Sequence, residues 1–204
     1  MKAYIGKYIS DNKKSISILL MCLVVGLVAG LMVFQFLNEG TRNELVNSIH
    51  KTLDLTKQEG FEGINVIKNG LLSNFLMLVL LYLSAITLIA PGLVCIIDGL
   101  KGFTLGLYIS SIFQVFGVGN GILVTLLLVV LVNIVYLPAF LYVCCNAIHF
   151  HYSLTEGSHN QSKLGVMLKE GYFALLGFSV MFLSVIMEQF LSLAVICIYQ
   201  NMKT

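Results

Sequence analysis

The spacing of charged residues constrains this sequence more than any other feature. Three long gaps without Asp, Glu, Lys or Arg run through most of the chain. The gaps lie between Lys14 and Glu39, between Lys68 and Asp98, and between Lys101 and Glu156. About 20 apolar residues of helix cross the roughly 30 Å hydrocarbon core of a bilayer. Each gap is long enough for at least one such helix, so we expect the chain to use the bilayer as its solvent.

The composition agrees with a membrane protein. Apolar residues make up 58% of the 204 residues and charged residues 11%, whereas a soluble domain has about 45–50% and about 25%. A soluble chain of this size cannot bury so much apolar surface, and a disordered one would be far more polar. The formal net charge of +2 leaves no electrostatic footprint for a nucleic acid. A soluble globular protein, a disordered protein and a nucleic-acid-binding protein are therefore excluded.

The gaps predict an all-α fold, a polytopic membrane helical bundle with about five transmembrane helices in a single domain. The uncharged stretch 102–155 must fold back, because 54 residues of helix would be about 80 Å long. Glycines 117, 119 and 121 mark the turn. The expected helices are 15–37, 71–97, 102–116, 122–148 and 171–200. The third is short, and a re-entrant helix there would reverse the side of the C-terminus.

Lysine counts predict the orientation of the bundle. The tail 1–14 carries four lysines against one aspartate, so the positive-inside rule places it in the cytoplasm. Alternation then puts segment 38–70 outside, the Asp98–Lys101 turn inside, the Gly117–Gly121 turn outside and the loop 149–170 inside. We expect a multi-pass protein of the cell membrane with one extracytoplasmic segment.

The extracytoplasmic segment 38–70 is expected to contain an amphipathic helix. Thr41 to Glu44 have the spacing of a capping box. Leu45, Ile49 and Leu53 follow at helical spacing. Two interpretations stay open: the helix rests on the bilayer or on its own bundle, or these apolar residues face an extracytoplasmic partner.

No residue pattern predicts an active site. Catalytic motifs, cofactor fingerprints and structural zinc spacings are all missing, so no catalytic residue, cofactor, metal or small-molecule substrate is predicted. Cys145, His149 and His151 could together hold a transition metal in a membrane enzyme. Interfacial histidines at the end of a helix are the simpler interpretation. The five cysteines lie within apolar helices without a CxxC pair, which is typical of buried thiols.

Three charged residues motivate the main alternative function, a small membrane transporter or channel subunit. Asp98 and Lys101 stand three apart between two expected helices and could pair at the cytoplasmic interface. Glu188 lies in the last apolar stretch. Ion coupling needs carboxylates inside the membrane, and a structural or interfacial Glu188 is the simpler interpretation.

Small and polar residues inside the apolar stretches predict helix contacts. Gly26 and Gly30 form one GxxxG pair, and Gly102 and Gly106 form another. Such pairs let backbones approach closely, either within the bundle or against another chain. In the fourth helix, Pro138 should kink the backbone and Asn133 should face the bundle interior.

Two short motifs resemble the stage II sporulation protein M family. The matching positions are Leu100, Lys101, Gly102 and Gly106 of its L-K-G-x-x-x-G, and Asn133 and Pro138 of its Q-N-φ-φ-φ-φ-P. Val132 stands where the family has glutamine, so no role of that glutamine is carried over. A basic tail, about five helices and one external segment are also similar to the family.

The resemblance implies a non-enzymatic scaffold for endospore engulfment, located in the sporulation septum and the engulfing membrane. The family is associated with two extracytoplasmic peptidoglycan hydrolases, an amidase and a lytic transglycosylase, which it helps to localise. Membrane lipid and these hydrolases are therefore the implied partners. Segment 38–70 and the Gly117–Gly121 turn are the faces that such partners could reach.

Overall fold

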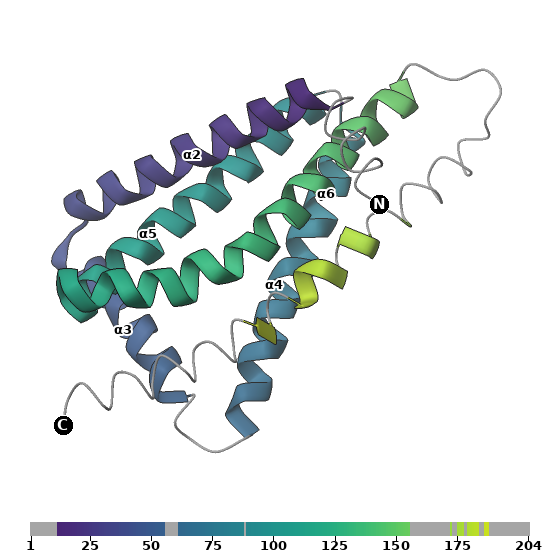
Figure 1. The fold of residues 1–204 in the computed structure, drawn as a ribbon. Helices are drawn as coiled ribbons and strands as arrows, with labels where there is room; N and C mark the ends of the chain where they lie inside the picture. The colour runs from purple at the N-terminus through teal and green to yellow at the C-terminus, as the bar shows by residue number, and fades with distance from the viewer. Residues whose placement is uncertain are drawn as a thin grey trace.

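The computed structural model describes residues 12–55, 61–87, 89–155, 172, 175–177, 179–183 and 186–187. Within these ranges the chain is helical and contains no strand. The elements are α2 (Lys13–Phe36), α3 (Glu39–Leu55), α4 (Phe61–Ala85), α5 (Ala90–Thr125), the π-helix η1 (Leu126–Val130) and α6 (Leu131–Thr155) (Figure 1). The all-α prediction is confirmed for this part of the chain.

Three of these helices are long and apolar enough to cross a membrane: Lys13–Phe36, Ala90–Thr125 and Leu131–Ser153. Leu72–Ala85 is a shorter apolar helix. The expected loop 149–170 is described only as far as Thr155, and of the expected helix 171–200 only residues 172, 175–177, 179–183 and 186–187 are described, all of them helical. The count of five therefore stays a prediction.

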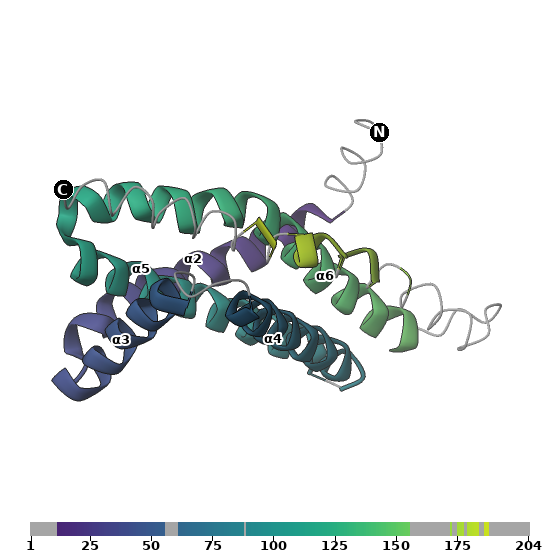
Figure 2. The same cartoon turned by 90° about the horizontal axis from the view of Figure 1, so that it is seen from below.

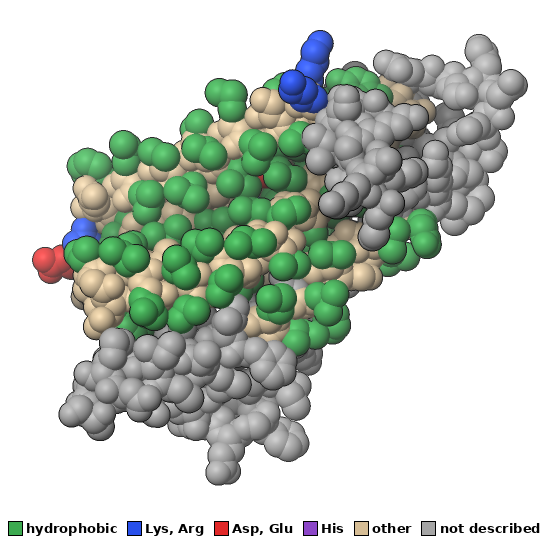
Figure 3. All heavy atoms as spheres, viewed as in Figure 1, with side chains coloured by type: hydrophobic (Ala, Val, Ile, Leu, Met, Phe, Trp, Pro, Cys, Tyr) green, Lys and Arg blue, Asp and Glu red, His purple; other side chains and the backbone are tan. Residues whose placement is uncertain are grey.

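The surface of the bundle is apolar where a bilayer would surround it. On α2, Met21, Val25 and Met32 are each at least 60% exposed. Figure 3 shows hydrophobic side chains over α2, α5 and α6, with most of the visible charged side chains near the two ends. Water would not tolerate so continuous an apolar surface on a single soluble chain, whereas lipid satisfies it.

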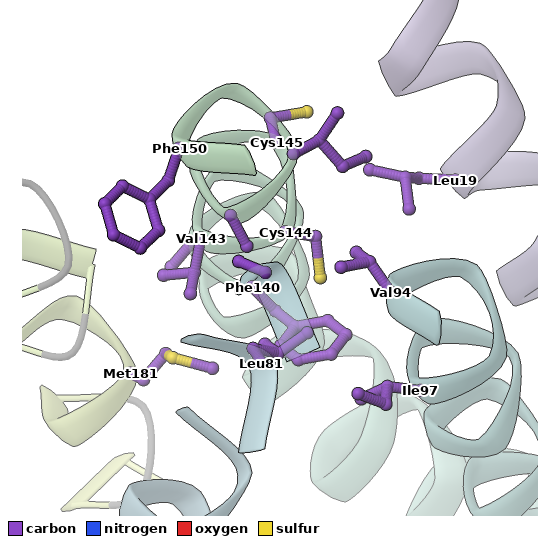
Figure 4. Close-up of a cluster of buried hydrophobic side chains, with 14 of the residues drawn as sticks. Leu19, Leu81, Val94, Ile97, Phe140, Val143, Cys144, Cys145, Phe150 and Met181 are labelled. Atoms are coloured by element: carbon purple, nitrogen blue, oxygen red, sulfur yellow. The ribbon is translucent and has the colours of Figure 1, made fainter. Parts of the chain in front are cut away.

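Helix direction alternates along the chain. α2 and α5 run parallel, and α4 and α6 run the opposite way (Figure 1). Figure 2 shows α3 and α4 on one side of α5 and the first half of the return helix on the other. The main core lies where α2, α4, α5 and α6 meet, around Leu19, Leu81, Val94 and Phe140 (Figure 4).

The expected turn at Asp98–Lys101 is wrong, because these residues lie inside α5. The chain turns instead at residues 86–89. α5 then begins with Pro91 in its first turn, where a residue without a backbone N–H is well tolerated. On the other side, the Thr87 hydroxyl donates to the Ser84 carbonyl 2.6 Å away and closes the end of α4. Charge gaps alone could not reveal this turn.

Moving this turn changes two expected helices. Range 71–97 is divided between α4 and α5, and range 102–116 is the second half of a longer helix. From Ala90 to Gly117, α5 is about 40 Å long at 1.5 Å per residue. The shortness that motivated a re-entrant helix is therefore not found.

Gly117 reverses the chain as expected. Its φ of 72° and ψ of 177° are non-helical, and the positive φ favours glycine. The remainder of α5, η1 and α6 form one return helix that ends at Thr155, beyond the expected residue 148. Within it, the Asn133 amide donates to the Val129 carbonyl 2.7 Å away, so this side chain finds its partner in its own helix.

Two ends of the bundle can be distinguished by their contacts. At one end, His149 Nε2 donates to Asn12 Oδ1, and His151 Nδ1 donates to the Ala85 carbonyl at 3.1 Å. At the other end, Ile49 of α3 packs beside Phe116. Segment 38–55 and Gly117 thus share one end, and the start of α2 shares the other with residues 149–155.

Candidate functional site

The glycines of α2 and α5 bring these two helices into backbone contact. A Cβ atom added at Gly102 would collide with the Leu23 carbonyl, and one added at Gly26 would collide with the Gly99 carbonyl. Gly30 and Gly106 likewise face each other's backbone. Both GxxxG pairs therefore serve contact within the bundle, which was the first of the two interpretations.

Lys101 connects this helix pair to the rest of the bundle. Its ammonium nitrogen lies 4.5 Å from the centroid of the Tyr136 ring on α6. The Tyr136 hydroxyl donates to Asn74 Oδ1 of α4 at 2.9 Å. Leu100 points away from the bundle and is 57% exposed, as suits a lipid-facing side chain.

The two sequence motifs meet at this contact. Tyr136 stands between Asn133 and Pro138 in one motif, and Lys101 belongs to the other. No sequence pattern predicted a role for Tyr136 or Asn74. The Tyr136 hydroxyl and the Asn74 amide could have suggested this pair, because such polar groups need partners inside an apolar bundle.

Asp98 lies in the bundle interior, so its expected place at an interface is wrong. Its side chain is 0% exposed, and neither carboxyl oxygen has a hydrogen-bond partner among the described residues. The expected pairing with Lys101 is therefore not found as a hydrogen bond. Glu188, the other acidic residue considered, lies outside the described residues.

The histidines and cysteines considered as metal ligands occupy separate places. His149 is bonded to Asn12 and His151 to the Ala85 carbonyl. Cys145 is buried and belongs to the main core cluster (Figure 4). Within the part of the chain that the structure describes, no group of three possible ligands is arranged to hold a metal.

Arg42 fixes the corner between α2 and α3. Its Nη2 donates to the Gln35 carbonyl at 2.9 Å and to the Phe34 carbonyl at 3.3 Å. Its guanidinium also lies 5.5 Å from the centre of the Phe34 ring. A cation at the C-terminal end of a helix interacts favourably with the exposed carbonyls. The expected capping box is wrong, because α3 begins at Glu39 and residues 41–44 lie inside it.

The apolar side of α3 faces its own bundle. Ile49 is 4% exposed and packs with Ile112, Phe116 and Val124. Leu45 is half-buried, and the Leu53 side chain lies outside the described part. Of the two interpretations for this helix, packing on its own bundle therefore applies to Ile49, whose side chain is not available to a partner. The exposed side of α3 is polar and includes Asn43, Asn47 and His50.

The comparison with protein families decides the family of the chain. The model of stage II sporulation protein M matches residues 17–193, which include both motifs. The chain belongs to this family. With its apolar helices, it is a sporulation-related membrane protein. Searches of curated proteins and of solved structures found no match.

Proposed function

We propose that this chain is a non-enzymatic membrane scaffold for endospore engulfment. It helps to localise two peptidoglycan hydrolases, an amidase and a lytic transglycosylase, at the sporulation septum. Family membership supports the sporulation setting. The observation that carries the proposal is α3, a helix held at one end of the apolar bundle with its polar side exposed.

With the N-terminal tail in the cytoplasm, as its lysines lead us to expect, α3 lies on the side of the membrane where such partners act. A cytoplasmic tail places the start of α2 inside, and the opposite end, with α3 and Gly117, then faces the outside. Peptidoglycan hydrolases act on that side of the membrane. The start of α2 and α3 lie at opposite ends of the bundle, because His149 bonds Asn12 at one end and Ile49 packs beside Phe116 at the other.

Asn43, Asn47 and His50 form the proposed docking surface. Their spacing of four and three residues puts them on one face of α3. Arg42 and Ile49 hold the helix in place from the other side. A fixed helix with exposed amide and imidazole groups can bind a protein through hydrogen bonds without first paying for its own ordering.

The test replaces the docking surface in the native host. The variant Asn43→Ala, Asn47→Ala, His50→Ala should reach the membrane at normal levels, yet lose co-purification of both hydrolases and delay engulfment. Tyr152→Ala, exposed at the opposite end, is the matched control and should bind as the parent does. Deletion of the whole chain should block engulfment and scatter both hydrolases. If both hydrolases still reached the septum after deletion, scaffolding would be refuted while family membership would stand.

A further inference from the structure

Asp98 is a buried acidic side chain that the scaffold function does not use. It is the ninth residue of α5 and lies about 12 Å along the helix from Ala90. That depth is well inside the apolar part of the bundle. The side chain is 0% exposed, and both oxygens lack a hydrogen-bond donor in the described part of the chain.

Among the described residues, three thiols interact electrostatically with Asp98, and thiols bring no positive charge. Cys95 of α5 and Cys144 and Cys145 of α6 lie within electrostatic range of it. In Figure 4 the Cys144 sulfur points from α6 toward α5, beside Val94. Thiols are weak donors and cannot replace the hydration of a carboxylate.

In the described part of the chain, the other helices packed here place no cationic group within hydrogen-bond distance of Asp98. From α2, the Cys22 thiol interacts with Cys95. On α4, Tyr82 is the ionisable side chain between Leu72 and Ala85, and its ring packs on Phe150. Lys101, one turn further along α5, places its ammonium on the Tyr136 ring.

We infer that Asp98 is an intramembrane proton-binding site, held as a neutral carboxylic acid in this closed bundle. A bare carboxylate without donors or a counter-ion is very unfavourable in an apolar interior. A bound proton removes the charge without adding any atom that the packing must accommodate. Separation of α5 from α6 would hydrate Asp98 and release that proton.

Proton binding and helix packing are therefore linked. The closed bundle binds one proton more than the opened bundle, so its stability falls as the pH rises and is greatest at acidic pH. The proton-binding site is independent of the docking surface on α3, because Asp98 and Asn47 lie in different parts of the fold. Failure of one proposal leaves the other unaffected.

The first test measures thermal stability of the full chain in lipid nanodiscs from mildly acidic to mildly alkaline pH. The Tm of the parent should fall by roughly 3 °C for each pH unit. Asp98→Asn, which mimics the neutral acid, should remove that slope. Glu44→Gln, at an exposed acidic residue of α3, is the control and should keep it. Equal slopes in the parent and Asp98→Asn would overturn the inference.

The second test needs no substitution at Asp98. Infrared spectra of the parent should show a protonated carboxyl band that persists at alkaline pH, where exposed carboxyl groups are ionised. The band should shift in D2O. Its absence would overturn the inference, even if Asp98→Asn fails to fold. A rise in parent Tm with added Na⁺ at constant pH, without that band, would identify a metal cation as the occupant and also overturn it.

Discussion

At the scale of single residues, Tyr136 is the point where the two sequence motifs of this chain meet. Its ring accepts the Lys101 ammonium from α5, and its hydroxyl donates to Asn74 of α4. Its side chain is only 5% exposed. One aromatic residue thus links three helices by two different interactions, and each can be removed separately.

Substitutions of Tyr136 should separate the stability that the hydroxyl bond to Asn74 contributes from the stability that the contact with Lys101 contributes. Tyr136→Phe keeps the ring under Lys101 and loses the hydroxyl bond to Asn74, which should cost about 1 kcal/mol of stability. Tyr136→Leu should cost roughly 1 kcal/mol more, because the cation loses its aromatic face. Thermal unfolding in nanodiscs measures both changes. In a Lys101→Met background, Tyr136→Leu and Tyr136→Phe should differ by less; an unchanged difference would show that the cation–π contact contributes nothing.

Prediction for single residues failed where position depends on packing. The histidines at the end of α6 were expected to be interfacial; both bond groups at that end of the bundle, and their place relative to a membrane stays a prediction. Asp98 was expected at an interface because charged residues usually mark helix ends. Its burial depends on which residues of α5 pack against α6, and the sequence of α5 alone does not determine this.

At the scale of elements, glycine and proline were better guides than charge. Gly117 was expected to reverse the chain and does so. Pro91 stands in the first turn of α5, and weighting it above the Asp98–Lys101 pair would have found the turn at 86–89. The glycine pairs predicted close helix contact, but their spacing alone could not state which helices would meet.

The close contact of α2 and α5 predicts a strong response to a single methyl group. Gly102→Ala should destabilise the bundle by about 3 kcal/mol, because its Cβ would collide with the Leu23 backbone, which cannot move as a side chain does. Gly119→Ala is the matched control, since a Cβ there meets nothing within 4 Å. The amount of folded protein extracted from membranes and its Tm measure the effect. Equal behaviour of both variants would contradict the helix contact.

At the scale of the whole molecule, alternation along the chain groups the connections at two ends. α3 shares one end with Gly117, and the start of α2 shares the other with the end of α6. The charge gaps predicted this grouping although one turn was misplaced. Moving that turn from residues 98–101 to residues 86–89 leaves the number of membrane crossings unchanged. Absolute orientation rests on the lysines of the tail and stays a prediction.

Labelling of single added cysteines tests the orientation directly. Asn47→Cys on α3 should react with a membrane-impermeant thiol reagent in intact cells, since that end is expected outside. Tyr152→Cys at the opposite end should react only after permeabilisation, and the parent chain gives the background from native cysteines. A reporter fused after Thr204 should be extracytoplasmic if five helices cross. The reverse labelling pattern would place α3 in the cytoplasm, on the far side of the membrane from the peptidoglycan, and α3 could not then hold enzymes that act on the wall.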